Sequence, residues 1–331
     1  MKKTILVTGG AGFIGSNLVK FFVKKYKESL IINIDSLSYA SNYEFIEELI
    51  SEKNYLFFNY DINDREKVNE IFENYDIDLV VHLAAESHVD NSIEEPLIFA
   101  HTNIIGTLNL LSSANYFWKN SKDKLFYHIS TDEVYGSLGK DGFFTENTPY
   151  NPRSPYSASK ASADHFVRAF YHTHNLPIII SNCSNNFGPN QHIEKLIPKV
   201  IYSIVNRKNI PVYGDGSNIR DWLFVEDHVM AINSIINFGK IGETYNIGGN
   251  CEISNIQLVK KIIIIADEIL GNKIGFSKEL ISFVNDRKGH DYRYAVNFSK
   301  LNSETNWTPK FSFEDSLRIT IDWYINLFIK L

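Results

Sequence analysis

The sequence predicts an α/β protein built on a doubly wound parallel sheet. Short runs rich in β-branched and aromatic residues alternate along the first half of the chain with stretches that have helical spacing, and this alternation is typical of parallel strands joined by helices. A glycine-rich segment, Gly9-Gly10-Ala11-Gly12-Phe13-Ile14-Gly15, follows the first run directly and opens the first helical stretch. Because glycines at that place allow a tight turn into a helix, the two observations together predict a Rossmann-type sheet with a smaller α/β lobe after it.

Each element is located by its local pattern. The predicted strands cover residues 5–8, 30–34, 55–59, 79–84, 125–130 and 178–181, and the predicted helices cover residues 14–26, 43–51, 65–75, 97–118 and 157–174. After Pro189 the pattern loosens, and a last amphipathic helix is predicted near residues 313–328. We expect residues 1–188, rejoined by about 221–250, to form a dinucleotide-binding domain, and residues 189–220 and 251–331 to form a smaller substrate-binding lobe.

The composition restricts the class of protein. The chain has 331 residues, of which 44% are hydrophobic and 22% charged, and a formal net charge of -6, values typical of a globular protein of about two domains. The acidic total and the absence of a Lys/Arg run argue against nucleic-acid binding, and no apolar run approaches the ~20 residues of a membrane-spanning helix. The two cysteines and ten histidines form no disulfide or metal-binding pattern. We therefore expect a cytoplasmic protein that binds no metal.

The glycine-rich segment and the second strand predict a dinucleotide site. Gly9, Gly12 and Gly15 let the backbone approach a pyrophosphate, and the free N–H groups at the start of the helix, around Phe13 and Ile14, meet its charge. Asp35 closes the second strand, where its carboxylate can accept hydrogen bonds from a ribose diol and would repel a 2′-phosphate. NAD is therefore favoured over NADP. Asp61 and Ile62, after the third strand, are expected to flank the adenine.

A phenol and an ammonium are predicted to share one helix face. Tyr156 and Lys160 are four residues apart, after the break at Pro155. A nearby ammonium, joined by a positive nicotinamide ring, can lower the pKa of a tyrosine toward neutrality. Tyr156 is therefore a candidate base for the oxidation of an alcohol.

Thr131-Asp132-Glu133 follows the fifth strand, at the edge of the sheet where doubly wound proteins bind their ligands. Two close carboxyl groups cannot both ionise cheaply, so the pair can hold one proton near neutral pH, as an acid and a base require. Neighbouring residues of a regular strand point to opposite faces. The chain must therefore bend after Ser130 if both acids are to reach one site.

These motifs resemble those of the extended short-chain dehydrogenase/reductase family and, within it, of the dTDP-glucose 4,6-dehydratases. The glycine loop and the Tyr-Lys pair are common to the superfamily, whereas Thr131-Asp132-Glu133, Asn185-Asn186 and Glu194-Lys195 are typical of the dehydratases. The matching segments cover residues 8–16, 82–90, 129–136, 154–165, 182–189, 194–198, 219–222 and 245–249.

The resemblance implies a lyase that uses NAD to convert a nucleotide-linked glucose, foremost dTDP-glucose, into a 4-keto-6-deoxy sugar. It implies that Tyr156 and Lys160 act in oxidation at C4, that Thr131 holds the C4 oxygen, that Glu133 removes the C5 proton and that Asp132 protonates the leaving C6 hydroxyl. Further cofactor contacts are implied at Leu83, Ala84, Ala85 and Thr102, together with Tyr156 and Lys160. Contacts to the sugar or diphosphate are implied at Ser87, Thr131, Asn185, Glu194, Lys195, Arg220, Arg287 and His290.

Some alternatives stay open at this point. Lys288 and Tyr292 depart from the usual family pattern, which affects the expected nucleotide preference, so UDP- or CDP-glucose are further candidate substrates. A nucleotide-sugar 4-epimerase would use the same NAD, Tyr and Lys but needs no acid and base at C5 and C6. A catalytically silent NAD-binding protein is disfavoured by the four intact catalytic side chains. The long helices over residues 97–118 and 157–174 are expected to form a homodimer interface, although their apolar stripes could also serve the core of one chain.

Overall fold

A seven-stranded parallel sheet organises the chain, which confirms the predicted doubly wound class, although the seventh strand, over residues 244–247, was not predicted. The structure, a computed structural model, describes residues 2–119, 121, 123–287 and 289–330. The strand order is β10-β6-β5-β4-β1-β2-β3, with every neighbouring pair parallel, which is a doubly wound order that reverses direction at β1. The strands are β1 (Thr4–Thr8), β2 (Leu30–Ile34), β3 (Tyr55–Phe58), β4 (Leu79–His82), β5 (Leu125–Thr131), β6 (Ile178–Cys183) and β10 (Thr244–Ile247).

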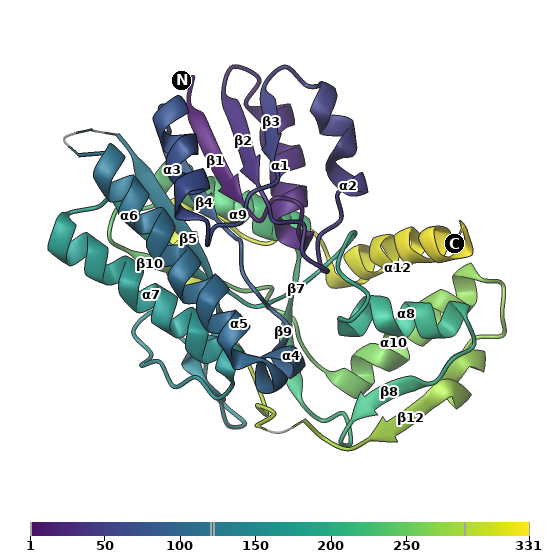
Figure 1. The fold of residues 1–331 in the computed structure, drawn as a ribbon. Coiled ribbons are helices and arrows are strands. Elements are labelled where there is room, and N and C mark those ends of the chain that lie inside the picture. The colour runs from purple at the N-terminus through teal and green to yellow at the C-terminus, as the bar shows by residue number, and fades with distance from the viewer. Residues whose placement is uncertain (1, 120, 122, 288, 331) are drawn as a thin grey trace.

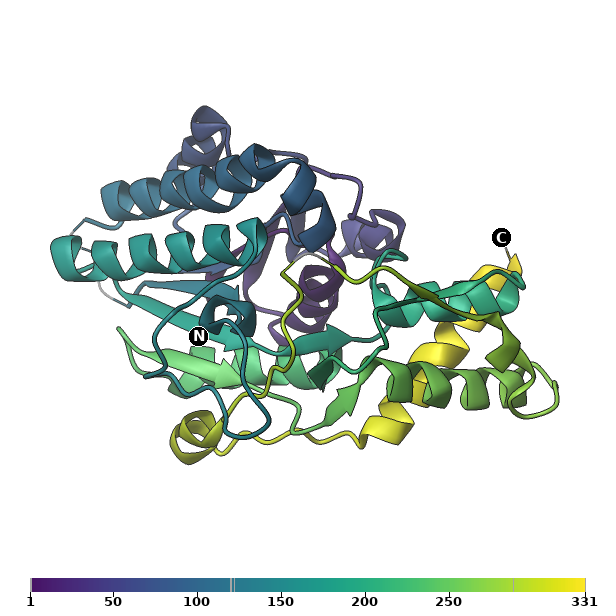
Figure 2. The same cartoon turned by 90° about the horizontal axis from the view of Figure 1, so that it is seen from below.

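Helices cover both faces of this sheet (Figures 1 and 2). In β1, Leu6 belongs to one apolar core, whereas its neighbours Ile5 and Val7 belong to another, because successive strand residues point to opposite faces. The helices that pack in the core of Leu6 are α3 (Arg65–Asn74), α6 (Thr107–Phe117) and α7 (Pro155–His174). Those in the core of Ile5 and Val7 are α1 (Phe13–Lys25), α9 (Val225–Phe238) and α11 (Ser299–Thr305).

The prediction of one continuous α-helix over residues 97–118 is wrong, because a π-helical stretch divides this segment. The segment consists of α5 (Pro96–Ala100), the π-helix η2 (His101–Gly106) and α6. Within η2, the buried side chain of Asn103 bonds to both backbone groups of Glu86 and to the hydroxyl of Ser159. These tertiary contacts accompany the widened turn, as is common for π-bulges near functional sites. Likewise, the helix predicted over residues 43–51 divides into α2 (Glu44–Glu47) and the 3-10 helix η1 (Glu48–Ser51).

The second half of the chain adds a smaller α/β body with its own apolar core. Its helices are α8 (Leu196–Val205), α10 (Asn255–Ile269) and α12 (Phe313–Lys330), and they pack with the parallel pair β8 (Ile210–Tyr213) and β12 (Ile281–Val284). A 3-10 helix, η4 (Phe276–Leu280), precedes β12. A three-stranded sheet of β7 (Asn185–Phe187), β9 (Ile219–Phe224) and β11 (Glu252–Ser254) lies between this body and the large sheet.

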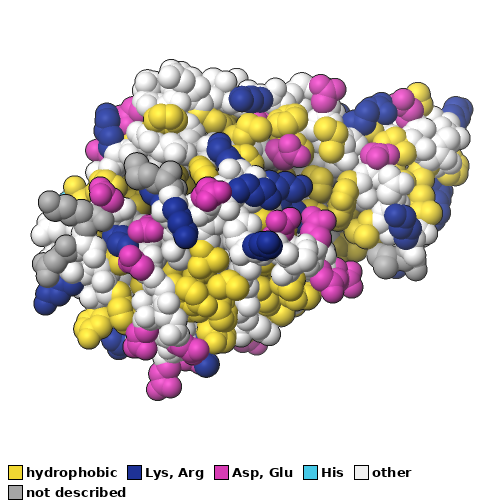
Figure 3. Space-filling model, turned by 90° about the horizontal axis from the view of Figure 1, so that it is seen from above, with side chains coloured by type: hydrophobic (Ala, Val, Ile, Leu, Met, Phe, Trp, Pro, Cys, Tyr) yellow, Lys and Arg dark blue, Asp and Glu magenta, His cyan; other side chains and the backbone are white. Residues whose placement is uncertain are grey.

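The surface carries charges of both signs. On the face drawn in Figure 3, Lys and Arg side chains alternate with Asp and Glu side chains around several apolar patches. Among the described residues, no helix is long and apolar enough to cross a membrane. The same part of the chain holds no cluster of three or more His, Cys, Asp or Glu side chains suited to a metal ion.

Phe187 on β7 tests the core of the smaller body. Its ring is 1% exposed and lies 5.4 Å from the ring of Phe313 and 5.6 Å from that of Phe224, measured between centroids. We expect Phe187→Ala to lower the free energy of unfolding by about 3–5 kcal/mol, because it removes buried apolar surface and leaves a cavity. Urea denaturation measures this loss, and Phe238→Ala, at a side chain that is 65% exposed, should change stability by less than about 0.5 kcal/mol. Equal losses in both variants would contradict the assignment of this core.

Candidate active site

One cavity of about 500 Å³ lies at the carboxyl ends of the central strands. Its wall brings together most of the site residues expected from the sequence: Gly9, Gly12, Phe13, Ile14, Gly15, Asp35, Asp61, Ile62, Leu83, Ala84, Ala85, Ser87, Thr102, Thr131, Asp132, Glu133, Tyr156, Lys160, Asn185, Glu194 and Lys195. Arg220, Arg287 and His290 do not belong to this wall. The cavity thus joins the glycine loop, the end of β5 and the start of α7 to the segment before α8.

The glycine loop is shaped by close backbone packing. Gly9 has a φ of +73°, and a Cβ atom there would lie 2.6 Å from the backbone nitrogen of Ala84. A Cβ atom on Gly15 would lie 2.1 Å from the carbonyl oxygen of Gly9. Only glycine fits either position, so the first turn of α1 can press against the loop. The first N–H groups of α1 have no partner within the helix and lie at the cavity wall, where an anionic group could bind.

Asp35 connects the glycine loop to the segment that follows β2. One carboxylate oxygen accepts a hydrogen bond of 2.9 Å from the backbone N–H of Ala11, and the other accepts from the backbone of Leu37 and the hydroxyl of Ser41. The side chain is buried but lines the cavity. Asp35 therefore fixes the loop and remains placed to meet a polar ligand.

The backbone bends at the end of β5, as two inward-facing acids require. β5 ends at Thr131, and the 3-10 helix η3 (Asp132–Tyr135) begins at the next residue. The Thr131 hydroxyl caps η3 by accepting a hydrogen bond from the backbone N–H of Glu133. Because of this turn, Thr131, Asp132 and Glu133 all reach the cavity wall.

Burial gives the two acids different proton affinities. Desolvation and the nearby carboxyl groups of Glu133 and Asp221 raise the pKa of Asp132 well above its usual value. Burial also raises the pKa of Glu133, but the cationic groups of Arg220, Lys195 and Arg287 oppose this rise. Asp132 is therefore the residue of the pair that retains a proton more strongly, and Glu133 is the more readily ionised one.

Tyr156 and Lys160 reach the cavity from the first turns of α7. Ser154 and Ser157 form a capping box that sets the start of this helix. The Lys160 ammonium donates a hydrogen bond of 2.8 Å to the carbonyl oxygen of Ile129 on β5. In the protein alone, burial raises the pKa of the Tyr156 phenol well above its usual value, and the Glu133 carboxyl adds to the rise. The expected lowering depends on a nicotinamide ring as well as on Lys160, so it stays a prediction.

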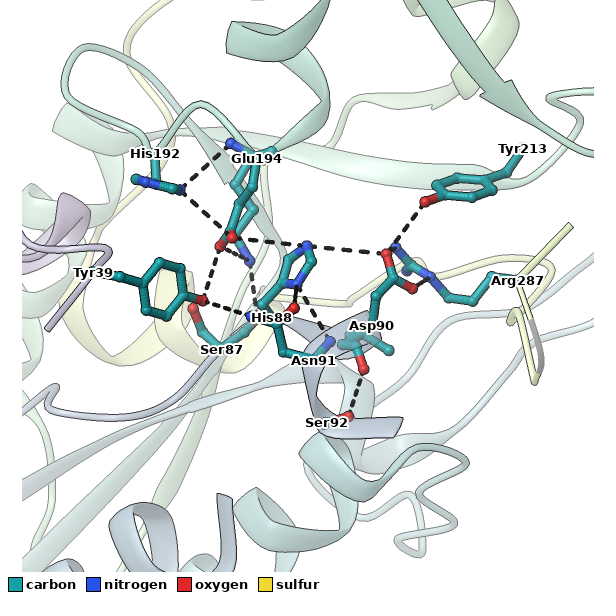
Figure 4. A network of polar contacts seen from close by, with 12 residues as sticks. Tyr39, Ser87, His88, Asp90, Asn91, Ser92, His192, Glu194, Tyr213 and Arg287 are labelled. Atoms are coloured by element: carbon teal, nitrogen blue, oxygen red, sulfur yellow. Dashed lines mark hydrogen bonds and ion pairs between the residues drawn. The ribbon is translucent and has the colours of Figure 1, made fainter. Parts of the chain in front are cut away.

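A polar network joins the loop after β4 to the smaller body beside the cavity (Figure 4). The helix α4 (Val89–Glu94) carries Asp90, whose carboxylate accepts hydrogen bonds from Arg287 and, at 3.3 Å, from the hydroxyl of Tyr213. Glu194 lies 3.9 Å from the imidazole of His88 and accepts a hydrogen bond of 3.3 Å from the hydroxyl of Tyr39. The network therefore spans five chain segments that are distant in the sequence.

The charges in this network reinforce one another. Although burial opposes it, the Arg287 guanidinium holds the pKa of Asp90 below its usual value. Likewise, His192 and Lys195 outweigh burial and hold the pKa of Glu194 below its usual value. These two carboxylates remain ionised, unlike Asp132.

The three expected substrate residues outside the cavity wall are engaged by protein groups. Arg220 donates to the carbonyl oxygens of Ile219 and Asp291, and its guanidinium lies over the ring of Tyr294. Arg287 pairs with Asp90, and His290 lies 2.6 Å from Asp286. Lys288, whose identity departs from the expected pattern, lies outside the described residues.

Several residues at or beside the cavity were not identified from the sequence. They are Ser36, Ser38, Ala40, Ser41, Glu86, Ile98, Ile129, Ser130, Cys183, Ser184, Asn186, Gln191 and His192 on the wall, and Tyr39, Asp90 and Tyr213 in the network. Most of them directly follow a strand end or lie next to an expected site residue. That position is the one signal by which they could have been found.

This fold and cavity define the class of the protein: a Rossmann-type enzyme with a Tyr-Lys pair and two carboxyl groups at the carboxyl edge of its sheet. The chain belongs to the family described as GDP-mannose 4,6 dehydratase, whose model matches residues 6–320. It is 49% identical over 334 residues to dTDP-glucose 4,6-dehydratase of Neisseria gonorrhoeae, with 98% of this chain and 96% of the relative covered. These findings confirm the resemblance to the dehydratases.

Solved structures agree with this assignment. The structure is similar to dTDP-glucose 4,6-dehydratase from Streptomyces venezuelae with NAD and TYD bound, with a TM-score of 0.89, 38% identity, and 98% of this chain and 97% of that one covered. It is also similar to UDP-glucose 4-epimerase from Thermotoga maritima, with a TM-score of 0.86, 29% identity, and 98% and 99% of the two chains covered. Dehydratases and epimerases thus share the fold, and the side chains in the cavity must distinguish them.

The raised pKa of Asp132 predicts an unusual dependence of stability on pH. The unfolded chain loses this proton near the ordinary Asp pKa of about 3.9, whereas the folded protein loses it only at a higher pH. The wild-type folded state is therefore destabilised progressively as pH rises between those two values. We expect Asp132→Asn, which carries no such charge, to have a higher Tm than wild type at pH 7.5 but not at pH 4.

The ion-paired Asp90 provides the control for this measurement. Its pKa is lowered in the folded protein, so Asp90→Asn removes a stabilising charge and should lower Tm at pH 7.5. Thermal denaturation followed by circular dichroism at several pH values measures both effects. A lower Tm for Asp132→Asn at pH 7.5 would show that Asp132 is not held protonated by the fold.

Proposed function

We propose that this enzyme catalyses the NAD-dependent dehydration of dTDP-glucose to the 4-keto-6-deoxy sugar. The observation that carries the proposal is the convergence of Tyr156, Asp132 and Glu133 on one cavity, with the two acids differing in proton affinity. An oxidation needs only the phenol and the cofactor. The additional acid and base are what the removal of water across two carbons requires.

The residues of the cavity fit NAD. The cradle at Gly9 and Gly15 leaves room for a pyrophosphate at the start of α1, and Asp35 offers a carboxylate to a ribose diol. Asp61 and Ile62 line the cavity and would flank the adenine, and Leu83, Ala84, Ala85 and Thr102 on the same wall would make further contacts to the cofactor. Bound NAD would accept hydride from C4 and return it to C6, and its positive ring would favour the phenolate of Tyr156.

Tyr156 takes the proton of the C4 hydroxyl as C4 becomes a ketone. Lys160, held by the carbonyl of Ile129, follows Tyr156 by one helical turn on the same face of α7, from which its positive charge would favour the phenolate that forms. The hydroxyl of Thr131 lies on the same wall and is suited to bind the C4 oxygen. Burial alone strongly disfavours the phenolate, so these positive and hydrogen-bonding groups have to offset that cost.

Glu133 and Asp132 then perform the elimination. The new ketone acidifies the C5 proton, and Glu133, the more readily ionised carboxyl, removes it. Asp132 gives its proton to the C6 hydroxyl, which leaves as water. As hydride is returned to C6, Glu133 gives the proton back to C5, so that the carbon skeleton gains no net charge. Tyr156 has then gained one proton and Asp132 has lost one, so the proton on Tyr156 has to pass back to Asp132 before the next turnover.

The diphosphate of the substrate meets cationic groups on the smaller body. Lys195 lines the cavity, and Arg220 and Arg287 lie close enough to it that their positive charges oppose the rise of the Glu133 pKa caused by burial. Guanidinium groups suit a diphosphate because they donate in a planar fork. Ser87, Asn185, Glu194 and His290 complete the proposed contacts. Diphosphate binding would have to compete with Asp90 for Arg287.

A nucleotide-sugar 4-epimerase is the second candidate, favoured by the shared fold and the same Tyr-Lys pair. An epimerase has no use for a protonated Asp132 beside Glu133. Burial of Asp132 raises its pKa and so destabilises the folded state near neutral pH, which makes the residue costly to keep without a function. The identity of the nucleotide depends on contacts to the base, so UDP- and CDP-glucose belong in any substrate test.

The mass of the product tests the function directly. We expect dTDP-glucose incubated with the enzyme to give a product lighter by one water, at a rate higher than for UDP- or CDP-glucose. A galactose product of unchanged mass would contradict the proposal and support epimerisation. Tyr156→Phe should lower turnover by at least about 10²-fold while leaving NAD bound. Glu133→Gln should abolish solvent-deuterium exchange at C5, whereas oxidation at C4 should continue.

We also propose that the enzyme is a cytoplasmic homodimer. Both described cysteines are free, which suits a reducing compartment. Apolar side chains are exposed on neighbouring helical elements: Leu97 and Ile98 on α5, Ile105 on η2, Tyr116 on α6 and Phe166 on α7. Figures 1 and 2 both show α6 and α7 side by side on the outer surface of the molecule. A second copy that packs the same helices would bury this surface in a four-helix interface.

Charged substitutions test the dimer. Leu97 and Tyr116 are 72% and 74% exposed, so Leu97→Asp and Tyr116→Asp should not disturb the core of one chain, yet together they should convert a dimer into a monomer. Sedimentation velocity at micromolar concentration measures the change, with Phe276→Asp on η4 as a control that should remain dimeric. A monomeric wild-type protein would overturn the proposal.

A further inference from the structure

Four polar side chains form a stripe along the buried side of α7. Tyr156, Lys160, Asp164 and Arg168 are spaced four residues apart, so they follow one another on one helix face. Tyr156 and Lys160 line the active-site cavity, whereas Arg168 lines a second cavity beside Tyr150 and Thr244. Asp164, between them, is fully buried and touches neither cavity. A buried charge at this place requires an explanation, since isolated buried carboxylates are strongly disfavoured.

Asp164 is held by three side chains, two on β5 and one in the loop before α7. One of its oxygens accepts hydrogen bonds from the hydroxyl of Ser130 at 2.9 Å and from the hydroxyl of Tyr150 at 2.8 Å. The other lies 3.1 Å from Nε2 of His128. The Tyr150 hydroxyl in turn accepts a hydrogen bond of 2.9 Å from Arg168. Asp164 is therefore connected to β5, to the loop before α7 and, through Tyr150, to a guanidinium.

The same part of β5 holds Lys160. The Lys160 ammonium donates to the carbonyl oxygen of Ile129, and the residues on either side of Ile129 are His128 and Ser130, the two β5 partners of Asp164. One short strand segment thus fixes both the ammonium and the carboxylate that lies one helical turn after it. A change at Asp164 would therefore act on Lys160 through this strand segment and through the charge of the carboxylate.

The charge states in this cluster assign the anion to Asp164. Burial lowers the pKa of His128 to about 4, so the imidazole is neutral near pH 7. Burial would raise the pKa of Asp164, but the close contact with the neutral imidazole of His128 and the positive charges of Lys160 and Arg168 outweigh burial and hold the pKa below its usual value. Burial lowers the pKa of Lys160, and Asp164 is the foremost group that opposes this lowering.

We propose that Asp164 is a positioning residue whose carboxylate keeps the Lys160 ammonium charged and fixed beside Tyr156 in the dry interior. The inference rests on the proposed function for the role of Tyr156. Without the carboxylate, the ammonium would have no anionic partner on α7 and would lose its proton more easily. A neutral amine would no longer stabilise the phenolate of Tyr156, so base catalysis at C4 would fail at a lower pH.

Several other titratable groups face Lys160 and Asp164. They are Tyr156 and Arg168 on α7, His82 on β4, His128 on β5, Asp132 and Glu133 on η3, Cys183 on β6 and Tyr150 before α7. Burial lowers the pKa of His82 and raises that of Cys183 to about 12, so both are neutral near pH 7. Asp132 and Glu133 act on the phenol of Tyr156 rather than on the ammonium. Asp164 is thus the one carboxyl among these described residues that supports the charge of Lys160.

The variant Asp164→Asn removes the charge and keeps the shape. We expect the alkaline limb of its kcat/KM profile to shift to lower pH by about one unit or more, and Asp164→Glu to restore much of that shift. The pKa of the Lys160 ammonium, titrated by NMR in protein carrying ¹⁵N-lysine and assigned with Lys160→Met, should fall by the same amount. This second measurement needs no turnover, so it separates a failure of this inference from a failure of the proposed function.

Asp267 offers a matched control. It is a fully buried carboxylate in the smaller body, bonded to the backbone and hydroxyl of Ser277. Asp267→Asn should lower Tm but leave the alkaline limb and the Lys160 titration unchanged. An Asp164→Asn protein that loses stability without moving either readout would overturn the proposal. If Asp164→Asn does not fold, the wild-type titration decides: an ammonium of Lys160 that is already neutral at pH 7 would overturn it as well.

Discussion

The docking of α7 onto β5 is the constraint on which the active site depends. The capping box of Ser154 and Ser157 fixes where α7 begins, and that start determines which face carries Tyr156 and Lys160. The bond from Lys160 to the carbonyl of Ile129 then sets the height of the helix along the strand. Two residues later β5 ends, and η3 turns its acids toward the same cavity. The distance between phenol and acids is thus set by one helix–strand contact rather than by loops.

The smaller body is held to this frame by ion pairs and hydrogen bonds at the rim of the cavity. Asp90 on α4 binds Arg287, and Glu194 lies between His88 and His192. Such exposed or half-buried pairs contribute little to stability individually and are weakened by salt. They can therefore be exchanged for contacts to an anionic ligand at small cost, in contrast to the apolar contacts within each core. Binding of a diphosphate at Arg287 would act on a contact that joins the two parts.

The sequence was sufficient to predict six strands of the sheet and the residues of the glycine loop, because both depend on local patterns, whereas β10 was not predicted. Buried parallel strands are short apolar runs, and the run over residues 30–34 coincides with β2. The glycine loop needs no distant partner to be identified. The π-helical turn at Asn103 could not be predicted, because it depends on Glu86 and Ser159, which approach only in the folded chain. The network of Asp90 with Arg287 was missed for the same reason.

Helical spacing indicates a charge near Tyr156 but not the depth of burial, which raises the pKa of the phenol in the protein alone. Burial disfavours the charged form of every group in this region, and the resulting pKa depends on the hydrogen-bonding and charged partners that each group has. Asp132 has only weak hydrogen bonding and lies near Glu133 and Asp221, itself a buried carboxyl whose pKa is raised to about 6, so its proton is retained.

Asp164, equally buried, has hydroxyl, imidazole and cationic neighbours, so it is ionised. The fold thus places a carboxylic acid on one side of the Tyr-Lys pair and a carboxylate on the other. This asymmetry is what the proposed proton donation by Asp132 and the proposed support of Lys160 by Asp164 require. It follows from the hydrogen-bond partners of each group, since both side chains are aspartates.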